Sequence, residues 1–214
     1  MDTNFQAIMD VKLDHLRKNL ELRRFQVSIV EDAAGAVRLV KDTIAPGSSV
    51  GLGGSMTLEQ TGILAGLRTM DIKLQDRYAP GLTSQQKQEV LRQGFSADYF
   101  LCSANAISMD GRIYNVDGNG SRTAATIFGP SHVIMVVGTN KIVPDEAAAI
   151  QRIKDVAAPV NCQRLGRNTP CRQVGHCVDC MVDQSICAAW VRLDRSSTPQ
   201  RIHLVIIRSG QWGY

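Results

Sequence analysis

The stretch Ser49-Val-Gly-Leu-Gly-Gly-Ser-Met-Thr57 joins a short apolar strand to the start of a helix. Glycines at such a junction let the backbone approach a ligand closely. Free N–H groups at the start of the helix suit a phosphate or carboxylate, although a plain tight turn also explains the glycines. Thr57-Leu-Glu-Gln60 matches a capping box, with Ser55 as the alternative cap. Met56 replaces the third glycine of the dinucleotide fingerprint, so the loop favours an anion over a dinucleotide.

Apolar strands alternate with helical segments on both sides of this loop. An amphipathic first helix is predicted from the apolar spacing of Phe5, Met9, Leu13, Leu16 and Leu20. Strands are predicted at 25–30, 49–52, 72–74, 99–102, 132–137 and 202–207. Helices are predicted at 33–44, from the glycine loop to about 70, at 84–94, and from Pro144 as a first helical residue. This alternation predicts an α/β fold whose mostly parallel sheet is covered on both faces.

Composition narrows the class of protein. The chain has 214 residues, 44% hydrophobic and 21% charged, and 24 Lys plus Arg against 20 Asp plus Glu give a net charge of +4. These values are typical of one globular α/β domain, or of one domain with a small appendage. The basic residues form no run that would indicate a nucleic-acid partner. No stretch reaches the roughly 18 apolar residues of a membrane helix, and no signal peptide is recognisable, so we expect a cytoplasmic protein without membrane insertion.

A polar loop follows the strand at 99–102. Within 105–122, Asp110-Gly111 is typical of a hairpin turn, and Gly118-Asn119-Gly120 forms a second flexible part beside Asp117 and Arg122. Loops at the ends of parallel strands line the ligand crevices of α/β proteins. Ordinary turn capping and a surface ion pair are the alternative explanations of these polar residues.

The cysteines carry the sharpest chemical signal. Four of them follow the pattern Cys171-x5-Cys177-x2-Cys180-x6-Cys187. Thiolates at this spacing can wrap one soft centre, either an iron–sulfur cluster or zinc. The spacing is neither a ferredoxin run nor a paired zinc ribbon, and free thiols or a disulfide stay open as well. Cys102 is expected to be a buried bystander, and Cys162 is a bystander or a substitute ligand.

Three segments resemble the LUD-domain family of lactate utilisation proteins. They are GLGGSMTLEQTG (51–62), SANAISMDGRIYNVDGNGSRTAATIFGP (103–130) and VVGTNKIV (136–143). The resemblance covers nearly the whole chain and implies a three-layer Rossmann-like α/β/α sandwich, similar to the sugar-isomerase and CoA-transferase superfamily. We therefore expect a LUD-type α/β domain at 1–160, a Cys-rich metal-binding segment at 161–190, and a C-terminal strand at 191–214 that returns to the domain.

The resemblance also implies a ligand site. A small anion, namely a carboxylate, a phosphate or a CoA ester, would bind at the glycine loop. The implied ligand-binding residues come from that loop and from the polar loop, with Asp110 facing the same crevice: Gly53, Gly54, Ser55, Thr57, Asn115, Asp117, Asn119 and Arg122. Glu59 and Asp110 are the only candidate catalytic residues, and either type is a common capping or turn residue.

The function implied is a part in oxidising lactate to pyruvate, as an oxidoreductase component working with iron–sulfur partner subunits. This redox context favours an iron–sulfur cluster, 4Fe–4S, over zinc at the four late cysteines. A ligand-sensing or assembly subunit with structural zinc is the alternative, and a CoA transferase or sugar-phosphate isomerase is a minor one. Homo-oligomerisation stays open.

Overall fold

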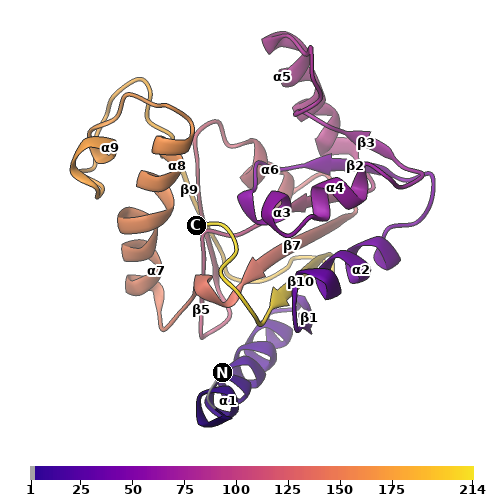
Figure 1. Ribbon diagram of the computed structural model, residues 1–214, viewed down its shortest axis with the longest axis vertical. Coiled ribbons are helices and arrows are strands. Elements are labelled where there is room, and N and C mark those ends of the chain that lie inside the picture. The colour runs from indigo at the N-terminus through magenta and orange to yellow at the C-terminus, as the bar shows by residue number, and fades with distance from the viewer. Residues whose placement is uncertain (1–2) are drawn as a thin grey trace.

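The computed structural model describes residues 3–214 and is built on one six-stranded sheet (Figure 1). Every neighbouring pair of strands in this sheet is parallel. The predicted mostly parallel α/β fold is therefore confirmed. In sheet order the strands are β1 (Gln26–Val30), β10 (Ile202–Ile207), β7 (His132–Gly138), β4 (Tyr99–Cys102), β2 (Ser49–Leu52) and β3 (Lys73–Gln75).

Helices cover both faces of this sheet, because its strands are apolar on both sides. Alternate residues of β7 face opposite layers: Met135 packs in one core cluster and Val136 in the other. One layer consists of α2 (Ala33–Thr43), α3 (Met56–Gln60) and α4 (Ile63–Leu67). The opposite layer contains α1 (Thr3–Leu22) and α6 (Ser121–Ile127). The result is the predicted three-layer sandwich.

A second, smaller sheet extends the layer of α1 and α6. Its order is β8 (Ile142–Val143), β5 (Ala106–Ser108), β6 (Ile113–Asp117) and β9 (Ala189–Leu193). Strands β5 and β6 form the hairpin predicted at Asp110-Gly111. Strands β8 and β9 were not predicted, because β8 has two residues and β9 alternates half-buried and exposed positions.

The helix predicted from the glycine loop to about 70 is two helices. Gly62 separates α3 from α4 and adopts a left-handed backbone, with φ of 79°. The Ser55 hydroxyl caps α3 by accepting the N–H of Leu58 at 3.2 Å. The capping box predicted at Thr57 is therefore wrong: Thr57 lies inside α3, and its side chain is fully buried.

The C-terminal third is more helical than the sequence indicated. Helix α7 (Glu146–Arg152) starts after Asp145, which caps it, so Pro144 precedes the helix. A π-turn at Ile153–Ala157 then continues into α8 (Ala158–Arg164), and α9 (Pro170–Val174) follows. The remaining elements are α5 (Ser84–Gln93) and two 3₁₀ turns, Gly94–Ser96 and Thr139–Lys141. Within residues 3–214, no helix combines the length and apolarity that crossing a bilayer requires.

Candidate functional site

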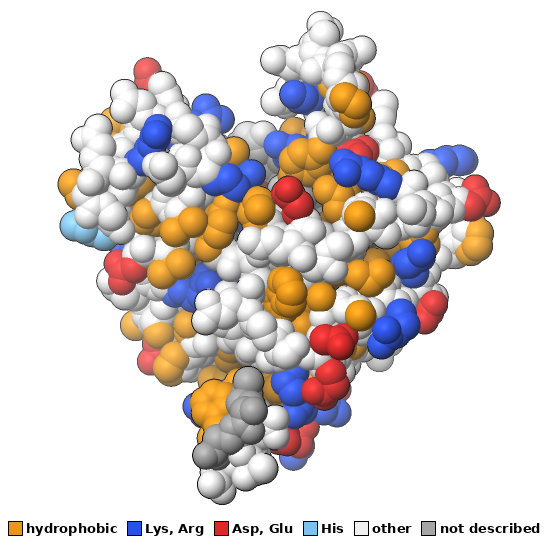
Figure 2. All heavy atoms as spheres, in the orientation of Figure 1, with side chains coloured by type: hydrophobic (Ala, Val, Ile, Leu, Met, Phe, Trp, Pro, Cys, Tyr) orange, Lys and Arg blue, Asp and Glu red, His pale blue; other side chains and the backbone are white. Residues whose placement is uncertain are grey.

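A cavity of about 460 Å³ opens where β2, β4 and β7 end. Gly54 and Ser55 follow β2, Ser103 follows β4, and Lys141 follows β7. Figure 2 shows the surface hollowed between the lobe of α8 and α9 and the lobe of α5, with basic side chains on both sides. The lining is strongly cationic: its acids are Asp117 and Asp183, and its bases are Arg77, Arg122, Lys141, Arg164 and Arg167.

Lys141 stands at the buried end of this cavity, with 2% of its surface exposed. Its Nζ donates to the Thr57 hydroxyl at 2.9 Å and to the Ser103 hydroxyl at 2.9 Å. The two hydroxyl oxygens lie 3.3 Å apart. We call Lys141, Thr57 and Ser103 the lysine cluster. It unites residues from the ends of three adjacent strands.

The lysine cluster contains no acid. Burial and, to a lesser extent, the guanidinium charges of Arg152 and Arg122 together lower the pKa of Lys141 from 10.5 to about 7. Both arginines are held in place by oxygens of the protein: Arg152 donates to the Asn105 carbonyl at 2.5 Å, and Arg122 donates to the Ser103 carbonyl at 3.1 Å. Near neutral pH the amine is therefore divided between its charged and neutral forms.

The segment Trp212-Gly213 lies against the lysine cluster. Thr57 donates its hydroxyl proton to the Trp212 carbonyl at 3.1 Å. Gly213 has φ of 64°, and a Cβ there would lie 2.5 Å from Thr57 Oγ1 and 3.2 Å from Lys141 Nζ. Only glycine fits this approach, so the contact between this segment and the lysine cluster depends on it.

Five of the sequence-predicted ligand residues do line the cavity: Gly54, Ser55, Asp117, Asn119 and Arg122. Several also have local structural partners. The Asp117 carboxylate accepts the N–H of Thr123 at 3.1 Å, and the Asn119 side chain accepts the N–H of Ser121 at 3.1 Å. Arg122 Nη2 donates to the Val116 carbonyl at 2.8 Å. These polar side chains therefore hold the surrounding loops in place and also line the cavity.

Other predicted residues lie outside the lining that the described residues form. A Cβ at Gly53 would meet Cys102 Cβ at 3.0 Å, so this glycine lies in a tight packing contact and not in the lining. Thr57 lies behind the wall, where it holds Lys141. Asn115 is buried between the hairpin and the β4–β5 connection, and its side-chain oxygen accepts the N–H of Asn105 at 3.1 Å. Glu59 is exposed on α3.

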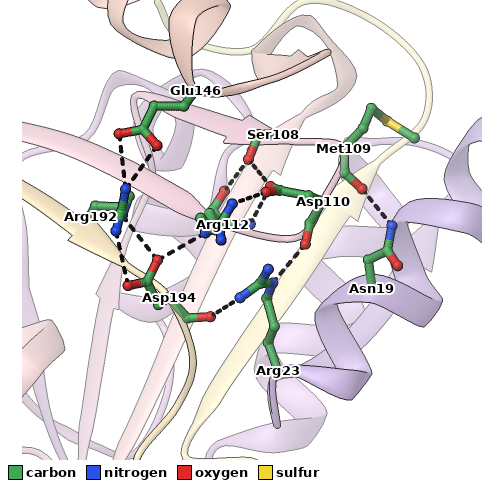
Figure 3. Close-up of polar contacts among 9 residues, drawn as sticks. All are labelled: Asn19, Arg23, Ser108, Met109, Asp110, Arg112, Glu146, Arg192 and Asp194. Atoms are coloured by element: carbon green, nitrogen blue, oxygen red, sulfur yellow. Dashed lines mark hydrogen bonds and ion pairs between the residues drawn. The ribbon is translucent and has the colours of Figure 1, made fainter.

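The structure corrects the position expected for Asp110, which does not face the cavity. It lies in the β5–β6 turn, where its carboxylate accepts hydrogen bonds from the Ser108 hydroxyl and the Arg112 guanidinium (Figure 3). The turn chemistry of an Asp-Gly pair explains this placement. The Arg112 guanidinium also forms an ion pair with the Asp194 carboxylate at 3.0 Å. Asp194 in turn pairs with Arg192 at 2.9 Å.

The late cysteines gather with Cys162 around one small core. Cys162 and Cys171 are buried with Ile186, and Cys187 packs against them. The pKa of the Cys187 thiol is raised to about 12, first by burial and then by the charges of its thiol neighbours: Cys162, Cys177, Cys171 and Cys180.

In the described part of the chain, these cysteines form no preformed metal site. Across the described residues 3–214, no group of three or more His, Cys, Asp or Glu side chains has the arrangement that holds a metal ion. The donor set nonetheless suits a soft centre. The N–H of Asp179 also donates to Cys177 Sγ at 3.4 Å.

Sequence reasoning missed Lys141 and Ser103 as site residues. Both lie in the segments quoted for the family resemblance, yet a lone Lys or Ser carries no motif. Their position was the available signal, because each follows an apolar strand at its carboxyl end. The carboxyl ends of parallel strands meet at one edge of the sheet.

Comparison with known proteins agrees with the geometry. A sequence model of the LUD domain matches residues 13–207. A crystal structure of a DUF162 family protein from Deinococcus radiodurans, at 1.70 Å resolution, superposes with a TM-score of 0.51. It covers 92% of this chain and 97% of its own, at 15% sequence identity, and DUF162 is the LUD domain. At that identity it supports the fold alone. No functionally curated protein matches the sequence significantly.

Proposed function

This chain belongs to the LUD domain family, and from that premise we propose that it binds a small anion in its basic cavity as a component of a system that oxidises lactate to pyruvate. One observation carries the anion-binding proposal. Lys141 is a buried base at the cavity wall, and no acid of residues 3–214 forms an ion pair with it. A buried charge without a partner is costly, and a bound anion would supply that partner.

The outer part of the cavity supports the same proposal. Arg77, Arg164 and Arg167 line it, and none of them forms an ion pair within the described part of the chain. Guanidinium groups bind carboxylates and phosphates in a two-pronged geometry. A carboxylate of the size of lactate or pyruvate fits easily in about 460 Å³.

Calorimetric titration tests the anion site with lactate, pyruvate, inorganic phosphate and acetyl-CoA as separate probes. We expect at least one of these anions to bind at a one-to-one ratio. Arg164→Gln with Arg167→Gln should weaken that binding at least tenfold. The matched control, Lys12→Gln, removes an exposed charge on α1 and should leave affinity unchanged. Absence of binding by all four probes, or equal binding by the double variant, would contradict the proposal.

The second part of the proposal concerns the cysteines. We infer that Cys171, Cys177, Cys180 and Cys187 hold an iron–sulfur cluster, which would supply one-electron transfer beside the cavity. The support is chemical: five thiols share one neighbourhood, and residues 183–186 of the same segment line the cavity. Binding would require these cysteines to rearrange into a coordinating group.

Anaerobic purification tests this part. We expect iron and acid-labile sulfide in the protein, together with the visible absorption of iron thiolates. Cys177→Ser should remove both, whereas Cys102→Ala, a buried thiol in β4, should retain them. A colourless protein that contains one zinc would assign the cysteines a structural role, and a metal-free protein would remove the metal altogether.

The cellular setting belongs to the same proposal. We place the protein in the cytoplasm, with iron–sulfur subunits as partners, because its thiols are free and its family context is redox chemistry. Co-purification of such subunits with the tagged chain from its native source is the expected result. Recovery of the chain alone under anaerobic conditions would contradict it.

A further inference from the structure

We propose that Lys141 forms an imine with the carbonyl carbon of a 2-oxo acid bound in the cavity. The inference rests on the proposed anion site, and it adds a covalent step and a substrate class to that site. Pyruvate is the simplest member of this class that carries a ketone. It combines a ketone with an adjacent carboxylate. The ketone would react with the Lys141 amine, and the carboxylate would bind the arginines of the cavity.

The surroundings of Lys141 are those of a lysine nucleophile. Its Nζ is buried at the end of an accessible cavity, where water is largely excluded. Arg152 and Arg122 add positive charge nearby, and burial together with these charges lowers its pKa to about 7. Desolvation and a neighbouring cation are the two known ways of keeping a lysine amine neutral and reactive.

Position favours the amine over the other nucleophiles of the cavity wall. Lys141 is fixed by two hydrogen bonds, whereas an exposed lysine samples many rotamers. The Ser103 hydroxyl also lines the cavity, but no His or carboxylate accepts its proton among its hydrogen bonds within residues 3–214. The amine of Lys141 is thus the best-activated nucleophile in this wall.

The step balances without an oxidant or a reductant. The Nζ lone pair attacks the ketone carbon and forms a C–N bond, while the C=O π pair moves to oxygen, which takes up a proton. The nitrogen loses a proton to give a neutral carbinolamine. The hydroxyl group then takes up a second proton and leaves as water while the nitrogen lone pair forms the C=N bond, and the resulting iminium releases its remaining N–H proton. Amine and ketone thereby yield imine and water.

Ser103 and Thr57 are suited to move these protons. Both hydroxyl oxygens lie 2.9 Å from Nζ and 3.3 Å from each other. Of the two, Ser103 lines the cavity, so its hydroxyl is placed to give a proton to the departing oxygen. Thr57 is fully buried, and its bond to the Trp212 carbonyl orients it as a positioning residue.

Borohydride trapping tests the inference on the full chain. The protein is incubated with pyruvate, reduced with sodium borohydride, and analysed by intact mass and peptide mapping. We expect one adduct per chain, on Lys141, and none with lactate, which lacks a ketone. Labelling should be half-maximal near pH 7, the pKa of Lys141, whereas an exposed lysine requires a pH near its ordinary 10.5.

Variants keep the test independent of any single substitution. Lys141→Met should abolish the adduct, and Lys12→Met should retain it. Ser103→Ala should slow adduct formation roughly a hundredfold, the scale of general acid–base catalysis. A wild-type adduct mapped to Lys141 supports the inference even if Lys141→Met does not fold.

Parallel calorimetry separates the two proposals. If pyruvate and lactate both bind but no adduct forms on Lys141, the imine is overturned and the anion site survives. If none of the four anions binds and no adduct forms, both proposals fail. Labelling spread over exposed lysines, without preference for Lys141, also overturns the imine.

Discussion

Two polar clusters of this protein differ in how their charges are paired and how deeply they are buried. The lysine cluster buries one base among two hydroxyls, with no acid beside it. In the ion-pair network of Figure 3, Arg112 and Arg192 both pair with acids, which are Asp110, Asp194 and Glu146. Its side chains are between 33% and 52% exposed, so water stabilises each of these charges as well.

The two clusters differ in whether the protein itself pairs the charge with one of opposite sign. Exposed pairs contribute little stability, and these link the β5–β6 turn, the end of β9 and the start of α7. A buried base without a partner destabilises the fold, and its presence calls for a compensating role. Asp110 was a candidate from its sequence and proves to be a turn residue. Lys141 had no sequence motif and stands in the cavity.

The largest expected effect is a gain in stability on removing the buried base. Lys141→Met should raise the free energy of unfolding at pH 6 by roughly 1–4 kcal/mol, because an apolar side chain of similar length replaces an unpaired charge. Urea unfolding measures it. A loss of stability at pH 6 would contradict the account, since it would mean that the charge is already compensated within the protein.

The same variant tests how the free energy of unfolding depends on pH. Lys141 has a folded pKa of about 7 against 10.5 unfolded, so between these values the unfolded chain holds a proton that the folded chain has released. This group therefore makes wild-type stability rise as pH increases through that window. The advantage of Lys141→Met should be largest below pH 7 and should shrink towards pH 10.5. An advantage independent of pH would contradict the lowered pKa.

The next largest effect on stability is expected in the Trp212-Gly213 segment, which lies against the lysine cluster. Gly213→Ala should cost roughly 1–3 kcal/mol, because it combines a left-handed backbone with a clash at Thr57. Gly47→Ala is the matched control: its φ is 76°, but nothing lies within 4 Å of the added Cβ. It should cost about 1 kcal/mol and leave ligand binding unchanged. If both variants bind ligand equally, the segment does not shape the site.

In the paired network the effects should be smaller. Asp110→Ala should cost about 1 kcal/mol, since it removes one side chain from a hairpin turn that other contacts also hold. Its effect on pyruvate or lactate affinity should be nil, because Asp110 does not line the cavity. Calorimetry decides this. A tenfold loss of affinity would mean that Asp110 does contribute to ligand binding, and it would contradict the distinction between the two clusters.

The smallest expected effect belongs to Arg192. Arg192→Ala removes its pairs with Glu146 and Asp194, in which every side chain is more than a third exposed. We expect a loss of about 0.2–1 kcal/mol that vanishes in high salt. Thermal unfolding at low and high ionic strength measures it. A large loss that persists in high salt would mean that this network is not screened by solvent.

The layers of the fold were predictable because both faces of the main sheet are buried. Strands such as β7 and β10 are continuous apolar runs, which is typical of a parallel sheet between two layers. The break at Gly62 and the two-residue strand β8 were not predictable, because tertiary contacts decide such short elements. Ser55 and Thr57 are both good caps, and burial of Thr57 decided between them.

The site was predictable in outline only. Gly54, Ser55, Asp117, Asn119 and Arg122 were found from their loops, since strand-end loops converge. Lys141 was missed because the property that distinguishes it, burial without an acid, exists only in three dimensions. Whether the cysteines hold a cluster stays a prediction.

The most direct test of the central claim, that Lys141 is a buried base awaiting an anion, is its own titration. Nuclear magnetic resonance of labelled lysine side chains, assigned with Lys141→Met, follows its pKa with and without saturating lactate. We predict a pKa near 7 in the free protein and a clear rise when lactate is bound, because the carboxylate stabilises the charged amine. A pKa near 10.5 that lactate does not move would contradict the account.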